Sequence, residues 1–252
     1  MHTDLMRFSE QLAHTTTLDA CLAEVQAATD QLGFKTLIYD YAPVPVSHEG
    51  ALITPSVFKT LNAPTDMHTL WCERGYYQID PVQQCAARRT TPFVWSFSAD
   101  THWNGALTDA HRPVAHYIRD YGLSTGLTVP LHLPDGGFAT LTAIVDGTPD
   151  GAERQAQHNL GEMLVLAHAF QSRASELLAP AERCCTHIHL TRRERECLQH
   201  SAKGLTAKGI AATLNRSQAT VNLHLVGAAR KLGARNRVEA VVRGLHYRLV
   251  EI

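Results

Sequence analysis

The spacing of apolar and polar residues predicts helices at both ends of the first 180 residues. Apolar positions recur at helical intervals in 3–31, with a break near the middle, and again over about 151–178. Thr17 or Asp19 is a suitable N-cap for the second half of the first stretch, and Gly33 is a suitable stop. Amphipathic helices of this kind need a partner surface, which the intervening segment is expected to supply.

Strands are predicted between these helices, where β-branched and aromatic residues gather. Two such runs, 125–134 and 138–146, are joined by Pro-Asp-Gly-Gly, and Asp-Gly between alternating runs is typical of a β-hairpin. Residues 43–64 are rich in proline and are expected to be irregular. Further expected elements are strands at 35–42 and 92–97, and helices at 66–75, 80–89 and 108–122. We therefore predict an α/β/α sandwich with a mainly antiparallel sheet.

The last part of the chain is predicted to be an all-α unit of four short helices, so that the whole chain belongs to the α+β class. The first helix begins at Thr191, which forms a capping box with Glu194. The third begins at Ser217 and ends at Gly233. A short helix, a tight turn and a longer basic helix form a helix-turn-helix. The predicted organisation is a domain at 1–178, a linker at 179–188 and a helix-turn-helix domain at 189–252.

The third of these helices has one apolar face and one face suited to DNA. The residues expected to be buried are Val221, Leu225, Ala228 and Leu232. On the opposite face, apolar side chains can meet thymine methyl groups, asparagine can pair with adenine, and hydroxyl and cationic groups suit phosphates. The candidate DNA contacts are Gln218, Thr220, Asn222, Leu223, Val226, Arg230 and Lys231. The alternative is a basic surface helix with no role in DNA binding.

Charge divides the chain at the same point as the pattern. Residues 181–252 contain 13 Lys and Arg and 5 Asp and Glu, a net charge of +8, whereas the whole chain has a net charge of −1. A basic part joined to an acidic part indicates a nucleic-acid-binding module on a sensing domain. No apolar run reaches the ~18 residues of a membrane span, and the N-terminus lacks a secretory segment, so a cytoplasmic protein is expected.

Cysteine and histidine spacing favours neither a metal site nor an enzyme. The six cysteines form no CxxC pair, so free thiols are expected, including the adjacent Cys184 and Cys185. The histidines near the linker, His187, His189 and His200, are too scattered to predict a metal, and no cofactor is expected. There is no Ser/His/Asp order and no Gly-rich phosphate loop, so an enzyme with acid/base chemistry is the less favoured alternative.

The C-terminal pattern resembles the LuxR-type helix-turn-helix, through LTRREREC at 190–197 and the run that ends in KLGARNRVEA. One position departs from the family, because Gly209 replaces the usual Glu. This change removes a second capping box from Thr206 and places glycine inside a helix, at a cost of about 1 kcal/mol. The resemblance implies a homodimer on pseudo-palindromic double-stranded DNA, with RNA polymerase as a further candidate partner. Its expected dimer surfaces are the helices at 151–178 and 235–248.

The N-terminal part resembles the autoinducer-binding domain of quorum-sensing LuxR regulators, not a phosphoryl receiver, whose acidic cluster and late lysine are missing. When Asp80-Pro81 is aligned with the family's Asp-Pro, Trp95 falls on the family's second Trp and Gly126 falls on its glycine before the central hairpin. Thr142 falls on a strand position that often contacts ligand. The resemblance implies that Asp80 accepts a hydrogen bond from a ligand amide. The alternative role for Asp80 is an ordinary helix cap.

Two substitutions at the expected site distinguish this sequence from lactone receptors. Met67 replaces a Trp that donates to the lactone carbonyl, and Trp71 replaces a Tyr that meets the acyl carbonyl; methionine has no donor. The pair resembles the plant-responsive LuxR solos, which lack a partner synthase and answer small plant compounds, some of them ethanolamine-type amides. A small plant-derived signal is therefore predicted, with an acyl-homoserine lactone or no ligand as alternatives. Weaker lining candidates, equally suited to core packing, are Tyr76, Tyr77, Phe93, Trp95 and Leu127.

Overall fold

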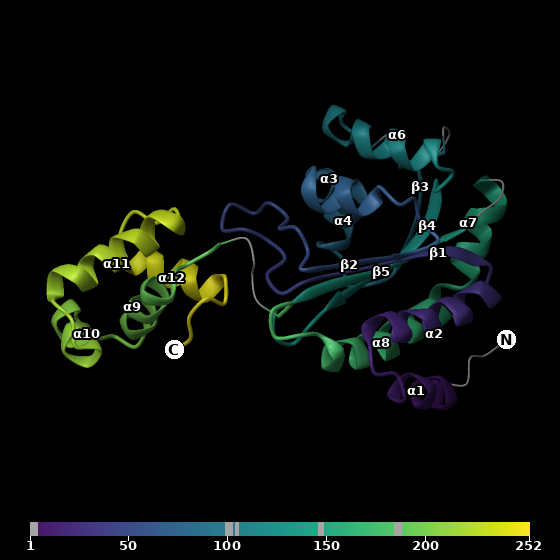
Figure 1. Ribbon diagram of the computed structural model, residues 1–252. Helices are drawn as coiled ribbons and strands as arrows, with labels where there is room; N and C mark the ends of the chain where they lie inside the picture. The colour runs from purple at the N-terminus through teal and green to yellow at the C-terminus, as the bar shows by residue number, and fades with distance from the viewer. Residues whose placement is uncertain (1–4, 99–102, 104–105, 146–148, 184–187) are drawn as a thin grey trace. The chain divides into compact units, whose positions relative to one another are not determined.

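The computed structural model describes residues 5–98, 103, 106–145, 149–183 and 188–252, so Cys184, Cys185 and His187 lie outside the described part. The chain divides into two compact units (Figure 1). The larger contains Met1–Pro45 and Leu52–Ala179, and the smaller contains Val46–Ala51 and Pro180–Ile252. The inclusion of 46–51 in the smaller unit was not predicted. In the described part, no helix is both long and apolar enough to cross a membrane.

The larger unit is built on a five-stranded sheet in the order β2-β1-β5-β4-β3, with every pairing antiparallel. The strands are β1 (Phe34–Ala42), β2 (Val57–Leu61), β3 (Phe93–Ser96), β4 (Thr125–His132) and β5 (Phe138–Val145). The predicted hairpin joins β4 to β5, and Gly136 takes the positive φ of 83° that its turn requires. The prediction that 43–64 is irregular was wrong at β2. This edge strand of five residues is defined by pairing with β1, which its own short pattern does not reveal.

Helices cover both faces of this sheet, which confirms the α/β/α sandwich (Figure 1). On one face lie α1 (Leu5–Ala13), α2 (Leu18–Gln31) and α8 (Leu160–Leu177), and on the other α3 (Tyr76–Ile79), α4 (Pro81–Ala86) and α6 (Arg112–Asp120). Other helical segments in the described part are the π-helical turn η1 (Thr69–Glu73), the 3₁₀ turn η2 (Asp109–His111) and α7 (Pro149–His158). The single helix predicted at 151–178 is two helices. They separate at Asn159, whose side-chain nitrogen donates to Gln155 O at 2.9 Å.

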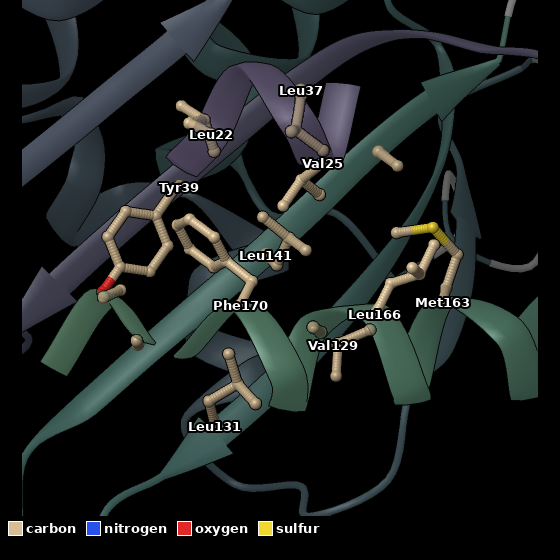
Figure 2. Close-up of a cluster of buried hydrophobic side chains, with 14 of the residues drawn as sticks. Leu22, Val25, Leu37, Tyr39, Val129, Leu131, Leu141, Met163, Leu166 and Phe170 are labelled. Atoms are coloured by element: carbon tan, nitrogen blue, oxygen red, sulfur yellow. The ribbon is translucent and has the colours of Figure 1, made fainter. Parts of the chain in front are cut away.

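The main hydrophobic core fills the space between the sheet and α2 and α8 (Figure 2). Tyr39 of β1 packs edge-on against Phe170 of α8, with ring centroids 4.8 Å apart, and its hydroxyl donates to Gln171 Oε1 at 3.1 Å. Successive side chains of a strand point to opposite faces. Ile38 and Asp40 flank Tyr39 in the strand and therefore face away from this core. The side chains of every second residue of β1, β4 and β5 thus point to the other face of the sheet, which α3, α4 and α6 cover.

The smaller unit contains α9 (Arg192–Ala202), α10 (Ala207–Leu214), α11 (Gln218–Lys231) and α12 (Arg237–His246). The capping box is present: the Thr191 hydroxyl accepts from Glu194 N at 3.3 Å, and Glu194 Oε2 accepts from Thr191 N at 2.7 Å. At the departure from the family, Gly209 N still donates to the Thr206 hydroxyl at 3.2 Å, so α10 keeps its cap.

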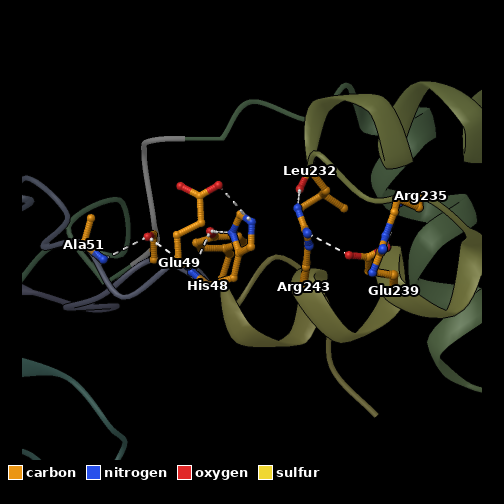
Figure 3. Close-up of polar contacts among 9 residues, drawn as sticks. His48, Glu49, Ala51, Leu232, Arg235, Glu239 and Arg243 are labelled. Atoms are coloured by element: carbon orange, nitrogen blue, oxygen red, sulfur yellow. Dashed lines mark hydrogen bonds and ion pairs between the residues drawn. The ribbon is translucent and has the colours of Figure 1, made fainter.

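A guanidinium ties the last helix of the smaller unit to the end of α11 (Figure 3). Arg243 Nη1 donates to Leu232 O at 2.8 Å, and its Nη2 lies 2.7 Å from Glu239 Oε1. Arg235 contacts the other carboxylate oxygen of Glu239 at 3.2 Å. Since Arg243 satisfies a terminal carbonyl of α11 as well as forming an ion pair, it fixes where α12 packs on that helix.

Candidate functional site

A narrow cavity lies on the face of the sheet opposite the main core. Strand alternation supplies Ile38, Thr142 and Ile144 from the sheet side. The full lining is Ile38, Phe58, Met67, Trp71, Asp80, Val82, Gln83, Trp95, Ile118, Leu123, Thr142 and Ile144. It is a mainly apolar site with a few polar groups, which is the usual composition of a small-molecule pocket.

Of the nine candidate ligand residues, the structure brings together Met67, Trp71, Asp80, Trp95 and Thr142 in this lining. The other four are not part of it. Tyr77 is fully buried and its hydroxyl donates to a carboxylate of β1, whereas Leu127 belongs to the main core. Phe93 stacks on a tryptophan ring, and Tyr76 packs on the ring of Trp71 with centroids 5.4 Å apart. These four pack as core or wall-supporting residues.

Asp80 is a helix cap, as one of its two expected roles requires, and it also contacts an aromatic side chain in the cavity wall. It precedes α4, and its Oδ1 accepts from Val82 N at 2.8 Å. Its Oδ2 accepts from the indole Nε1 of Trp71, also at 2.8 Å, and the residue is only 5% exposed. Burial raises the pKa of Asp80 to about 6, while the bonds from Trp71 and the backbone oppose that rise.

Trp71 is placed against this acid by an unusual backbone. It lies in the π-helical turn η1, and turns of this kind are frequent at functional sites. Its ring packs against those of Tyr76 and Tyr117, at centroid distances of 5.4 and 5.3 Å. Met67, one turn earlier, is 1% exposed. The two substitutions that set this sequence apart therefore both lie in the cavity wall, and the indole N–H is already engaged by the protein.

Trp95 lines the cavity, and its indole N–H donates into a pair of threonine hydroxyl groups. Its Nε1 donates to Thr128 Oγ1 at 2.9 Å, and this hydroxyl lies 2.9 Å from that of Thr142. Gly126 pairs with Trp95 across β3 and β4. A Cβ at Gly126 would lie 2.5 Å from the Trp95 ring and 3.1 Å from Ala143 O, so only glycine admits the indole here. This explains the glycine before the hairpin in physical terms.

Gly126→Ala is therefore expected to displace the Trp95 ring and to destabilise the larger unit by about 1–3 kcal/mol, the usual cost of overpacking. Tryptophan fluorescence and thermal melting measure the two effects. Gly161→Ala is the matched control, because a Cβ there meets nothing within 4 Å in helix α8. It is expected to be neutral or to stabilise by up to about 1 kcal/mol. An unchanged indole spectrum in Gly126→Ala would contradict the packing argument.

A buried polar cluster that sequence reasoning missed lies behind the cavity. Asp40 of β1 is fully buried and accepts from Tyr77 Oη and Gln83 Nε2, each at 2.9 Å, and from the Thr140 hydroxyl. Burial raises the pKa of Asp40 to about 7, and these hydrogen bonds oppose the shift. Two signals were available: an acid stands between two tyrosines in a mainly apolar strand, and Gln83 lies one turn beyond Asp80.

In the smaller unit, α11 exposes the face that the sequence predicted. Leu223 and Val226 are 71% and 67% exposed. The same face exposes Gln218, Asn222 and Arg230. The four residues expected to be buried, Val221, Leu225, Ala228 and Leu232, are buried.

The two remaining candidate DNA contacts have partners inside the smaller unit. Thr220 is half-buried, and its hydroxyl lies 2.8 Å from that of Ser217. Lys231 Nζ lies 2.7 Å from Glu194 Oε2, and this ion pair links the end of α11 to α9.

Comparison with known families agrees with this arrangement. The profile of the autoinducer binding domain matches residues 17–174, and that of bacterial regulatory proteins of the luxR family matches residues 189–243. The chain belongs to the LuxR family of quorum-sensing-type regulators. This LuxR-family regulator therefore has an N-terminal domain for an autoinducer-type small molecule and a C-terminal domain for DNA.

Relatives of the LuxR-family regulator are transcriptional regulators and not enzymes, as the sequence predicted. It is 34% identical over 189 residues to the quorum sensing-dependent transcriptional regulator RpaR of Rhodopseudomonas palustris, which covers 75% of this chain and 73% of RpaR. It is 25% identical to the transcriptional activator protein AnoR of Acinetobacter nosocomialis over 90% of each chain. The structure of Escherichia coli SdiA has a TM-score of 0.58 at 20% identity and covers 98% of both chains, which shows a shared fold.

Proposed function

We propose that this LuxR-family regulator answers a small signal whose N–H group is bound by Asp80, and that an ethanolamine-type amide of plant origin represents its ligand class. The observation that supports this proposal is the state of the two indole donors in the cavity wall. The N–H of Trp71 is engaged by Asp80, and that of Trp95 by Thr128. Met67 offers no donor.

An acyl-homoserine lactone presents two carbonyl groups and a ring oxygen but only one N–H. Its carbonyls lose hydrogen bonds to water on entering an apolar cavity, and they need donors in return. Among the described lining residues, the indole donors are already bound to protein acceptors. The hydroxyl of Thr142 is shared with Thr128. A ligand that donates is therefore better matched to this wall than one that mainly accepts.

The runner-up is an acyl-homoserine-lactone receptor of the same architecture. It is favoured by the relation to RpaR, which is named as quorum sensing-dependent. On this alternative, Trp71 would have to give up its bond to Asp80 and turn its N–H toward the ligand. The plant-responsive LuxR solos remain the better match to the pair Met67 and Trp71.

Thermal melting of the full chain separates these alternatives. N-octanoyl ethanolamine is expected to raise the melting temperature, because a ligand at about 100 times its Kd stabilises the folded state by about 2.7 kcal/mol. N-octanoyl homoserine lactone is expected to give a much smaller shift. Stabilisation by the lactone alone would make the proposed ligand class wrong, and no shift with either compound would favour a regulator without a ligand.

Exchanging the two unusual wall residues is expected to reverse the ligand preference. The double variant Met67→Trp with Trp71→Tyr restores an indole donor and a hydroxyl, each worth about 1 kcal/mol to a buried carbonyl. We expect the lactone to bind at least tenfold more tightly than to the wild type, and the ethanolamide to bind more weakly. Isothermal titration of both ligands measures this, and an unchanged ratio of the two affinities would show that other residues select the ligand.

We further propose that the regulator binds pseudo-palindromic DNA as a homodimer, with half-sites about one helical turn apart, and that α11 enters the major groove. The support for a dimer surface is an exposed apolar pair on α12, where Val238 and Val242 are 73% and 59% exposed. Scattered apolar side chains are normal on a surface, but two on one helix face indicate a contact. RNA polymerase is a further proposed partner.

A further inference from the structure

Gln83 carries a buried polar atom that the fold leaves without a partner. The residue lines the cavity beside Asp80 and is only 4% exposed. Its amide nitrogen donates to Asp40 Oδ2 at 2.9 Å and to Thr140 Oγ1 at 3.2 Å. Its amide oxygen, Oε1, is buried and has no hydrogen-bond partner within the described part of the chain. A buried acceptor left unsatisfied costs about 1–3 kcal/mol.

The orientation of this amide is set by the groups behind it. Asp40 presents a carboxylate oxygen to Gln83, and the Thr140 hydroxyl donates its hydrogen bond to the same carboxylate. Both atoms that face the Gln83 amide are therefore acceptors, so the amide must turn its NH₂ group toward them. Turning it over would place oxygen against oxygen. The carbonyl is consequently held away from the polar cluster and cannot swap places with the nitrogen.

The tyrosine in the cluster completes this arrangement. Tyr77 donates to the other oxygen of Asp40 at 2.9 Å and thereby holds the carboxylate in place. Asp40, Tyr77 and Thr140 are all buried. Three buried residues from β1, α3 and β5 thus position one glutamine, although none of the three lines the cavity. Such a support is what a binding group needs if it is to be rigid.

We propose that Gln83 Oε1 is a second ligand acceptor beside Asp80, and that the ligand presents two N–H or O–H donors at its polar end. The inference rests on the proposed function, because it places a ligand in the same cavity, and it adds which group selects the ligand. An acyl ethanolamine meets the requirement with one amide N–H for Asp80 and one hydroxyl for Gln83. A compound with a single donor leaves Gln83 Oε1 unsatisfied.

A ligand-by-variant cycle tests the pairing. Full-length wild type and Gln83→Met are titrated with N-octanoyl ethanolamine and with its methyl ether, N-octanoyl-2-methoxyethylamine, which keeps the amide N–H but has lost the hydroxyl donor. Methionine has a similar length and no carbonyl. In the wild type, the methyl ether is expected to bind at least tenfold more weakly than the parent compound. In Gln83→Met, the two compounds are expected to differ by twofold or less.

The outcomes separate this inference from the proposed function. If the ethanolamide binds the wild type and methylation costs the same factor in both proteins, Gln83 does not pair with the hydroxyl and the inference is overturned, while the ligand class stands. If neither compound binds the wild type, both proposals are overturned. Should Gln83→Met not fold, a crystal structure of the wild-type complex decides the matter: a ligand hydroxyl at hydrogen-bond distance from Gln83 Oε1 supports the pairing, and any other position overturns it.

Discussion

Asp80→Asn is expected to weaken the binding of N-octanoyl ethanolamine to the full chain by at least tenfold. An asparagine that keeps the cap on Val82 N turns its NH₂ toward the Trp71 indole, so two donors face each other where a donor met an acceptor. The ligand N–H then finds no acceptor. Hydrogen bonds to charged groups are worth about 1.5–3 kcal/mol, and a factor of ten in affinity is about 1.4 kcal/mol. A loss of about ten- to a hundredfold or more is therefore expected by titration calorimetry.

Thr17→Ala is the matched control for the capping role of Asp80. Thr17 caps α2, where its hydroxyl accepts from Ala20 N at 3.2 Å, and it is not part of the cavity wall. Losing this cap costs about 1 kcal/mol of stability and is expected to leave ligand affinity unchanged. In the absence of ligand, the purified Asp80→Asn and Thr17→Ala proteins are expected to bind DNA with the same affinity. Undiminished ligand binding in Asp80→Asn would remove this carboxylate from the mechanism.

The pH dependence of ligand binding gives the same assignment a second readout. Burial raises the pKa of Asp80 to about 6, so the group is ionised and accepts hydrogen bonds above that pH. Below pH 6 it becomes protonated and loses acceptor capacity. The affinity of the ethanolamide, which does not itself titrate in this range, is therefore expected to fall as pH decreases from 7 to 5. In Asp80→Asn, the part of the dependence that belongs to this carboxyl should be lost, and what remains is expected to come from Asp40, whose pKa of about 7 lies in the same range.

The helix-turn-helix was predictable because its signals are local. Thr191 and Glu194 lie three residues apart and form their capping box within one turn, and Ser217 accepts from Thr220 N in the same way. The buried face of α11 also follows from spacing within a single helix. In the larger unit, the register of β2 depends on its pairing with β1, and the Asn159 side chain at the helix break also donates to Leu32 O at 3.4 Å. Both contacts involve a distant segment, and neither was predicted.

The site was half predictable for the same reason. The residue spacing shared with the family located Asp80 and Trp95. It did not show that the Trp71 N–H donates to Asp80, because that hydrogen bond depends on the π-helical turn. Gln83 was missed altogether. Its role depends on Asp40 and Thr140, which are separated from it by 43 and 57 residues in sequence. Only the sheet brings these residues together, so no periodicity in one segment could indicate them.

Leu223→Asp is expected to abolish specific DNA binding while leaving the fold and the oligomeric state unchanged. Leu223 is 71% exposed on the proposed recognition face, so the substitution removes no core packing. An aspartate there faces the phosphate backbone and cannot contact a thymine methyl group. Each lost base contact costs about 1–3 kcal/mol, and charge repulsion adds to that loss. Fluorescence anisotropy with duplexes selected from a random pool should show at least a hundredfold loss.

Val242→Asp on α12 is the matched control, since it makes the same chemical change at a similarly exposed apolar residue, 59% exposed, away from the recognition helix. If α12 is a dimer surface, two aspartates meet across the two-fold axis, and sedimentation should show a shift from dimer to monomer. DNA affinity then falls only because the half-sites are no longer bound together, so raising the protein concentration should restore it. A higher protein concentration should not restore DNA binding by Leu223→Asp, because this variant has lost the contact that each subunit makes with its half-site. Recovery of both variants, or of neither, would contradict the assignment of the two exposed apolar faces to DNA and to the second subunit.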